Sequence, residues 1–401
     1  MGQPKFGEWF PIANNFGNPY CPLTRTNYTL GCMTCQIRQG RGMLDTVSAK
    51  RKSLPPAGEK ALVAAIRERA ATRSPSVRLG IGDDCAVLRP PTGSEIVVTT
   101  DLSLEQVHFR RDWHAPESAG HRCLARGLSD LAAMGARPIA AFLSLAVPIE
   151  LTGADRGPSW LDRFLNGLLS LANQYHVPLA GGDTAQSPLF DEAGSKQTGM
   201  VAADIVLVGS VPKGRALLRS GAKAGDLLYV TGALGGAEAE LLALGRNPQA
   251  FRKLTKSAPK HPHLYPEPRL AAGAKLLALR AATAAIDVSD GLSTDLAHLC
   301  EESGLAAEID TAAIPVHALA EKVEKDGWIP SALYLALHGG EDYELLFTAS
   351  PRTKVPAGIA GVPIRAIGRM KAHRKGKPFI EMIGTDGKRT PLDAGGWEHF
   401  R

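Results

Sequence analysis

Leu79-Gly80-Ile81-Gly82-Asp83-Asp84-Cys85-Ala86-Val87 is the stretch around which the chain is organised. It is a glycine-hinged turn that ends in paired carboxylates, and it precedes an extended run, Ile96 to Thr100, that closes on Asp101. Glycine lets a backbone approach a ligand closely, and clustered carboxylate oxygens suit a hard cation such as Mg²⁺. An Asp-rich solvated turn would have the same composition. The stretch alone therefore leaves both interpretations open.

The same combination of an acidic residue with Gly, Ser or Thr recurs further along the chain. It returns at Ser129-Asp130, at 181–184 (Gly-Gly-Asp-Thr), at 287–291 (Asp-Val-Ser-Asp-Gly) and at 339–343 (Gly-Gly-Glu-Asp-Tyr). Asp130 lies in an apolar helical pattern, where an unpaired carboxylate is costly, so a bound cation or a helix cap would satisfy it. Ser289-Asp290-Gly291 stands between a predicted strand and a helix start, which is typical of a phosphate site. The recurrence favours metal and phosphate binding.

Length and charge set limits on the kind of protein. At 401 residues and 44% hydrophobic content, the chain is long enough for two globular domains. We expect residues 1–55 to be a disordered or loosely packed extension, 56–210 to form a first domain and 211–401 a second. Residues 1–55 hold seven basic and two acidic side chains, +5, so only +1 of the net charge of +6 belongs to the rest. This distribution argues against a nucleic-acid surface on the folded body.

Several familiar signals are missing from the sequence. There is no run of eighteen apolar residues and no signal-peptide pattern in Met1 to Phe10, so we expect a cytoplasmic protein with no membrane partner. The turn Gly232-Ala233-Leu234-Gly235-Gly236 has the wrong spacing for a dinucleotide fingerprint. No P-loop pattern occurs, so any ATP chemistry must work without one.

The cysteines and two histidines have structural interpretations. A zinc site needs a second pair of ligands at matched spacing, and none follows Cys21, Cys32 and Cys35. The others, Cys85, Cys123 and Cys300, lie in apolar patterns and are expected to be small buried hydrophobes rather than disulfide partners. His261 and His263 stand in a Pro-bearing connection and are expected to be surface histidines.

Hydrophobic periodicity predicts alternating strands and helices, and so an α/β fold. The predicted helices span 59–71, 118–134, 158–176, 269–282 and 293–302, and the predicted strands span 96–100, 140–147, 201–208, 227–231, 284–288 and 344–348.

Taken in order, seven motifs resemble those of the thiamine-monophosphate kinase family. They are Gly-Ile-Gly-Asp-Asp (80–84), Thr-Thr-Asp with Val-His-Phe (99–101, 107–109), Leu-Ser-Asp-Leu-Ala-Ala-Met-Gly-Ala (128–136), Gly-Gly-Asp-Thr (181–184), Arg-Ser-Gly-Ala-Lys (219–223), Ile-Asp-Val-Ser-Asp-Gly-Leu (286–292) and Gly-Gly-Glu-Asp-Tyr-Glu-Leu (339–345). The resemblance covers about residues 58–401 and is specific, because all seven fall in the family's order.

The resemblance implies two α/β halves of mixed sheet and flanking helices, as in aminoimidazole ribonucleotide synthetase, with N-terminal halves pairing in a homodimer. It implies ATP-dependent phosphorylation of thiamine monophosphate to thiamine diphosphate, assisted by several Mg²⁺ ions. By motif position, metal ligands would be Asp84, Thr99, Thr100, Asp101, Asp130, Asp183, Asp287 and Asp290. ATP would contact Gly182, Asp183, Arg219 and Ser289, and the thiamine phosphate would contact His108, Glu341 and Trp397. Asp84, Asp130 and Asp183 would be the catalytic set.

Two alternative functions remain at this stage. One is another ATP-dependent synthetase of the same superfamily. The absence of a terminal cysteine disfavours hydrogenase maturation, and the absence of a Cys-Gly-rich loop before Gly80 disfavours selenophosphate synthesis. The other is a non-catalytic dimeric nucleotide-binding protein, which would need a broken acidic set. None of the acidic positions is broken.

Overall fold

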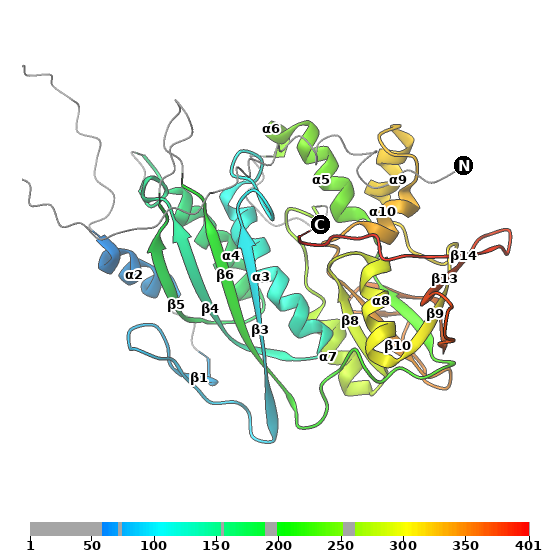
Figure 1. The fold of residues 1–401 in the computed structure, drawn as a ribbon. Coiled ribbons are helices and arrows are strands. Elements are labelled where there is room, and N and C mark those ends of the chain that lie inside the picture. Colours follow the sequence, from blue (N-terminus) through cyan, green and yellow to red (C-terminus); the bar gives the residue numbers. More distant parts are fainter. Residues whose placement is uncertain (1–57, 71–73, 154–155, 189–198, 252–260, 401) are drawn as a thin grey trace, which may run out of the picture. The chain divides into compact units, whose positions relative to one another are not determined.

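The computed structural model describes residues 58–70, 74–153, 156–188, 199–251 and 261–400. The expected N-terminal extension, with Cys21, Cys32 and Cys35, lies outside these residues. The described residues form one compact unit. The α/β prediction is confirmed, because helices and strands alternate along this unit in two mixed sheets (Figure 1).

The first half of the unit is built on a four-stranded sheet of order β3-β6-β4-β5. Its elements are α2 (Gly58–Arg69), β1 (Val77–Leu79), β2 (Val87–Leu88), β3 (Ser94–Leu104), α3 (Pro116–Ala133), β4 (Arg137–Val147), a 3₁₀ turn (Ile149–Leu151), α4 (Trp160–Gln174), β5 (Leu179–Gln186) and β6 (Ala202–Pro212). β6 pairs antiparallel with β3 and β4, whereas β4 and β5 run parallel. The Gly80–Asp84 turn connects β1 to β2, beside Ala180 at the start of β5.

The second half is built on an eight-stranded mixed sheet with the order β14-β13-β9-β12-β7-β10-β8, to which β11 adds at β12. Its strands are β7 (Leu227–Thr231), β8 (Ala284–Val288), β9 (Leu305–Asp310), β10 (Glu344–Ala349), β11 (Gly358–Ile359), β12 (Val362–Ala372), β13 (Ile380–Ile383) and β14 (Arg389–Pro391). Its helices are α5 (Gly236–Arg246), α6 (Pro248–Phe251), α7 (Leu270–Leu279), α8 (Leu292–Ser303), α9 (Ala318–Lys325) and α10 (Ala332–His338).

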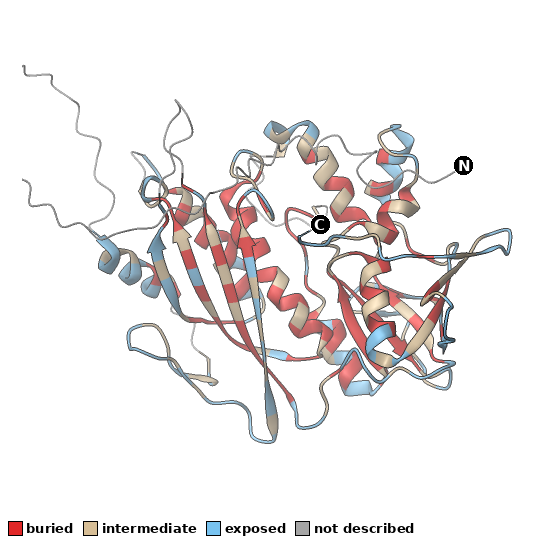
Figure 2. Cartoon of the chain, in the orientation of Figure 1, coloured by how far each residue is buried: buried red, intermediate tan, exposed pale blue. Residues whose placement is uncertain are grey.

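Helix α3 joins the two halves. It covers one face of the four-stranded sheet and also contacts α7, β8 and β10 of the second half. One hydrophobic cluster accordingly contains Leu128 of α3 together with Leu276 of α7 and Phe347 of β10. Figure 2 shows buried residues along nearly the whole of α3. No helix in the described ranges is both long and apolar enough to cross a membrane.

Strand alternation decides which side chains face α3. On β8, Ala285 packs in the cluster around α3, whereas Ile286 packs in a second cluster on the opposite face of the sheet, with α8. Because side chains alternate with a period of two, Asp287 shares the α3 side with Ala285. On β3, Thr99 faces α3 in the same way and Thr100 faces outward.

One cysteine prediction is wrong. Cys123 and Cys300 are buried, as expected, but Cys85 is exposed. Its neighbour Ala86 packs against a small cluster with Ala140 and Ala180, whereas Cys85 itself lies on the exposed part of the turn.

Two glycines allow α3 and α4 to pack closely. A Cβ on Gly120 would collide with the carbonyl oxygen of Phe164, and a Cβ on Gly167 would collide with that of Glu117. We therefore expect Gly120→Ala and Gly167→Ala each to lower the free energy of unfolding by roughly 1–3 kcal/mol, since the backbones must separate. Gly245→Ala in α5 is the control, because its Cβ would meet only a Trp113 ring atom at 3.3 Å. Chemical denaturation measures all three, and equal stabilities would contradict the packing argument.

Candidate active site

Four polar side chains of the largely apolar helix α3 share one face. Arg126 lies four residues after Arg122, and Ser129 and Asp130 lie three and four residues after Arg126. The helix is buried, so each of these groups needs a partner from another segment. The partners come from β3, from β8 and from the loop before β10.

Ser129 and Asp130 form one end of this face, which we call the acidic end. It contacts residues from both halves of the unit. The Thr99 hydroxyl on β3 donates to Asp130 Oδ2, and the Ser129 hydroxyl donates to Asp287 Oδ2 at 2.7 Å. Burial raises the pKa of Asp130, and burial together with the nearby charge of Asp130 raises the pKa of Asp287 to about 7. Two desolvated carboxylates beside a hydroxyl are hard oxygen donors that a divalent cation would stabilise. These residues fit Mg²⁺.

Arg126 lies between the carboxylates of Asp130 and Asp287 and the region around Glu341. Its Nη2 pairs with Asp101 Oδ1 at 2.6 Å, while burial, opposed by Arg126, raises the pKa of Asp101 to about 6. Its Nη1 is buried and finds no hydrogen-bond acceptor among the described residues. A buried donor without a partner is costly, and an anionic oxygen would satisfy it. Arg126 therefore suits a phosphate ligand.

Glu341 lies at the other end of the polar face. Its Oε1 accepts from Arg122 Nη2 at 2.6 Å and its Oε2 lies 3.0 Å from His263 Nδ1. Burial favours protonation, but Arg122 and His263 hold the pKa of Glu341 well below its ordinary value. Glu341 also adopts a left-handed backbone with φ of 65°, a strained conformation that clusters at functional sites.

The C-terminal segment reaches the same region. The Trp397 amide donates to the Asp290 carbonyl at 3.0 Å, and its indole Nε1 donates to His399 Nε2 at 3.3 Å. The His399 ring lies 5.6 Å from the His108 ring, whose pKa is lowered to about 4 by burial and by Arg126. Trp397 is 52% exposed, so its ring is available to a ligand. The structure thus brings His108, Asp290 and Trp397 near one another from three distant segments.

Three further candidate residues, Ser289, Asp290 and Arg219, lie near Asp130 and Asp287. Ser289 and Asp290 follow β8, and their amides donate to Asp295 Oδ2 at 3.0 Å. Burial raises the pKa of Asp290. Arg219 is exposed, and its positive charge acts on Asp130, Asp287 and Asp290.

Three candidate residues lie beyond this cluster. Asp84 is exposed on the glycine turn, and Asp183 is exposed on β5. Gly182, also on β5, is explained by packing as well, since a Cβ there would collide with Leu143 of β4. Across the described ranges, no group of three or more acidic, His or Cys side chains is poised to hold a metal.

Thr100 differs from its neighbour Thr99. Its hydroxyl donates to Asp204 Oδ1 at 2.7 Å on the outward face of the sheet. The resemblance names both threonines as metal ligands, but successive side chains on a strand point to opposite faces. The Thr100 side chain is therefore separated from the Asp130 and Asp287 carboxylates by the sheet itself.

The prediction of surface histidines is wrong for His263. It is 2% exposed and contacts Arg122, His114 and Glu341. Sequence reasoning also missed Arg122 and Arg126 as site residues. Their signal was present, since positions 122, 126 and 130 share one face of an apolar helix.

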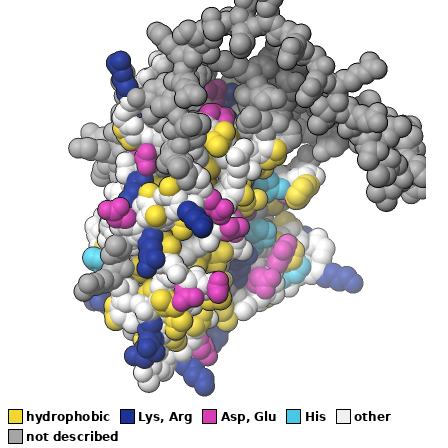
Figure 3. Space-filling view, turned by 90° about the vertical axis from the view of Figure 1, so that its left-hand side faces the viewer, with side chains coloured by type: hydrophobic (Ala, Val, Ile, Leu, Met, Phe, Trp, Pro, Cys, Tyr) yellow, Lys and Arg dark blue, Asp and Glu magenta, His cyan; other side chains and the backbone are white. Residues whose placement is uncertain are grey.

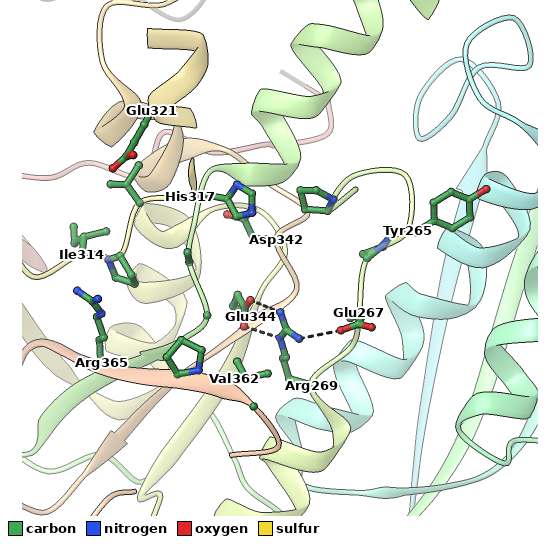
Figure 4. A pocket seen from close by; sticks show the side chains of 18 residues that line it. Tyr265, Glu267, Arg269, Ile314, His317, Glu321, Asp342, Glu344, Val362 and Arg365 are labelled. Carbon is green, nitrogen blue, oxygen red and sulfur yellow. Dashed lines mark hydrogen bonds and ion pairs between the residues drawn. The ribbon is translucent and has the colours of Figure 1, made fainter. Parts of the chain in front are cut away.

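A cavity of about 640 Å³ is lined by Asp342, the residue that follows Glu341 (Figure 4). Its wall includes Arg269, which makes a bidentate pair with Glu344 at 2.8 and 2.6 Å, and also Asp342, His317 and Tyr265. None of the predicted site residues lines it. It borders the candidate site through the segments that carry Glu341 and His263.

The raised pKa of Asp287 has a measurable consequence for the metal-free protein. The folded state retains a proton up to about pH 7 that the unfolded chain, with a pKa near 3.8, has already released. The contribution of Asp287 to the free energy of unfolding should therefore fall as pH rises from about 4 to 7. We expect Asp287→Asn to flatten this slope and to raise the Tm of the metal-free protein at pH 8, while weakening stabilisation by Mg²⁺. Thermal melts at several pH values test this, with the surface variant Asp326→Asn as control. An unchanged slope would contradict the assignment.

Comparison with known protein families matches both halves. The family described as AIR synthase related protein, N-terminal domain, matches residues 82–211, and the corresponding C-terminal domain matches residues 223–380. The expected two-part fold is thereby confirmed.

Individual relatives agree on one family. Thiamine-monophosphate kinase of Escherichia coli strain K12 is 40% identical over 348 residues, which is 86% of this chain and 98% of that protein. The crystal structure of thiamine-monophosphate kinase from Stenotrophomonas maltophilia superposes with a TM-score of 0.64 at 32% identity, covering 82% of this chain and 96% of that one. A structure of AaThiL complexed with AMPPCP and TMP superposes with a TM-score of 0.62 at 28% identity, covering 88% and 100%. With identity and coverage at this level, the chain belongs to the thiamine-monophosphate kinase family.

Proposed function

We propose that this protein transfers the γ-phosphoryl group of ATP to the phosphate of thiamine monophosphate, yielding thiamine diphosphate and ADP. The observation that carries the proposal is the polar face of α3, where carboxylates from both halves of the unit adjoin a buried guanidinium with an unused donor. The family relationship identifies the substrates, because one relative's structure holds TMP together with AMPPCP, an analogue of ATP.

The acidic residues would hold Mg²⁺, with Asp130 and Asp287 at the centre and Thr99 beside them. Bound there, Mg²⁺ would neutralise the phosphate oxygens of the two substrates and align them. We extend the set to Asp84, Asp183 and Asp290 by motif position. Asp101 pairs with Arg126. We keep Asp101 as a proposed metal ligand, which would give up this ion pair when Mg²⁺ binds.

The remaining residues would bind the two substrates. Arg219 and Ser289, with Gly182 on β5, would contact the ATP phosphates. His108, Glu341 and Trp397 would surround the thiamine part of the acceptor, whose thiazolium ring is cationic. Glu341 provides a negative charge and Trp397 a flat, half-exposed ring, and both favour such a cation.

The chemistry requires positioning more than a strong base. A phosphate monoester is largely ionised near pH 7, so its oxygen attacks the γ-phosphorus directly and the bond to the ADP oxygen breaks. Arg126 lies between the acidic residues and Glu341, where its Nη1 would donate to a phosphate oxygen as negative charge redistributes. The carboxylates of Asp130 and Asp287 would act only by holding the cation.

A purified-protein assay with ATP, Mg²⁺ and thiamine monophosphate tests the function. We expect thiamine diphosphate and ADP in equal amounts. Asp130→Asn should lower kcat by about 100-fold or more, because it removes a metal ligand while keeping the side-chain shape. Asp326→Asn, on the surface of α9's C-terminus, should not change kcat. If no thiamine diphosphate forms, the function is wrong, and if Asp130→Asn keeps its kcat, the metal assignment is wrong.

We also propose that two copies pair through the outward face of the four-stranded sheet, and that the reaction takes place in the cytoplasm, where ATP is available. Edge strand β3 exposes 44% of Ile96, 63% of Val98 and 51% of Leu102 on this face. A long apolar edge strand is normally covered. Figure 3, which views the side of the molecule that carries β1 and β5, shows hydrophobic side chains grouped among charged ones.

The pairing predicts the mass of the protein in solution. We expect a dimer for the wild-type protein and a monomer for Val98→Lys, because a charge at the centre of the apolar face opposes its burial. Leu279→Lys, at the end of α7, alters a comparably exposed leucine outside this face and should remain dimeric. Sedimentation or light scattering gives the masses. A monomeric wild-type protein, or a dimeric Val98→Lys, would contradict the interface.

A further inference from the structure

Two buried histidines form a hydrogen-bonded chain that ends on Glu341. His263 Nδ1 lies 3.0 Å from Glu341 Oε2, and His263 Nε2 lies 3.0 Å from His114 Nε2. His114 Nδ1 lies 3.1 Å from both the amide nitrogen and the carbonyl oxygen of Arg110. Each ring is about 3% exposed or less, so water does not complete their hydrogen bonds.

Burial lowers the pKa of both histidines, so both rings are neutral, and for two neutral rings only one direction of donation satisfies the whole chain. Glu341 is ionised, so its Oε2 can only accept, and His263 must carry a proton on Nδ1. His263 Nε2 is then an acceptor, so His114 carries its proton on Nε2. His114 Nδ1 in turn accepts from the Arg110 amide. In the reverse direction a lone pair on His263 Nδ1 would face the carboxylate at 3.0 Å.

Arg122 does not need the lone pair of His263. Its Nη1 lies 3.1 Å from His263 Nδ1, but the same nitrogen donates to the carbonyl oxygen of His263. Its Nη2 donates to Glu341 and to the carbonyl oxygen of His108 at 2.9 Å. Both guanidinium nitrogens are therefore satisfied when His263 Nδ1 is protonated.

We propose that His263 and His114 are positioning residues for acceptor binding, and that they lock the Glu341 carboxylate in one orientation through a fixed pair of neutral tautomers. The proposal rests on the proposed function, since it assigns Glu341 to the thiamine part of the acceptor. Arg122 donates a hydrogen bond to one carboxylate oxygen of Glu341, and His263 donates to the other. The carboxylate therefore cannot rotate. Its charge then stays directed at the cationic ring of the acceptor instead of turning toward Arg126.

Nitrogen NMR of histidine-labelled protein tests the tautomers directly. Protonated and unprotonated ring nitrogens resonate far apart, so the spectrum identifies each tautomer without any substrate. We expect His263 to be neutral with its proton on Nδ1 and His114 to be neutral with its proton on Nε2. A proton on His263 Nε2, or on both of its nitrogens, would overturn the proposal.

Kinetics test the positioning role. His263→Leu should raise the KM for thiamine monophosphate about 10-fold or more, while changing the KM for ATP less than about 2-fold, because it removes a hydrogen bond to a charged group at the acceptor only. His263→Asn, whose amide nitrogen replaces Nδ1, should recover most of this loss. His114→Gln, which keeps a donor near Nε2, should be milder than His114→Leu.

His121→Leu is the matched control. His121 is a buried histidine of α3 whose Nε2 donates to the Pro266 carbonyl at 2.8 Å, so it holds the same segment as His263 without touching Glu341. An equal rise in acceptor KM for His121→Leu would show that the effect is packing of that segment, and would overturn the proposal. A wild-type protein that forms no thiamine diphosphate would refute the proposed function and the acceptor role together. An unchanged KM in His263→Leu would refute the positioning role alone.

Discussion

Burial of α3 is the constraint on which the rest of the structure depends. The helix packs against α4 so closely that Gly120 and Gly167 leave no room for a side chain, and it also covers the four-stranded sheet and touches β8 and β10. A helix in this position has no solvent for its polar groups. The charges on the face that carries Arg122, Arg126 and Asp130 therefore need partners from other segments, and those segments converge there.

The convergence explains how two sheets of different topology share one site. β3 brings Thr99 and Asp101 from the first sheet, and β8 brings Asp287 from the second. Burial, and to a lesser extent the like charge of Asp130, raises the pKa values of Asp101 and Asp287, so ionised carboxylates are unfavourable here without a cation. Under the proposed function, Mg²⁺ would offset these charges, which suits phosphoryl transfer because charge neutralisation is its main requirement.

The opposite end of the α3 face is organised differently. There Arg122, His263 and His114 satisfy Glu341 completely before any ligand is present. Both Glu341 oxygens have partners here, whereas Arg126 Nη1, beside the carboxylates at the other end, finds no acceptor among the described residues. The contrast fits the two proposed ligand types, since the organic cation would meet a fixed carboxylate and the polyphosphate would be held through Mg²⁺.

The amino-acid sequence by itself determined the α/β class, most of the helices and strands, and the motifs that identify the family, because hydrophobic periodicity and glycine-acid turns are local properties. The pattern of Arg122, Arg126 and Asp130 on one helix face was also local. Only the tertiary structure decided that Thr99 rather than Thr100 faces α3, that Cys85 is exposed and that His263 is buried against Glu341. These outcomes depend on which surface each segment packs against. His263 and Glu341 are 78 residues apart in the chain (341 − 263), and no spacing rule connects them.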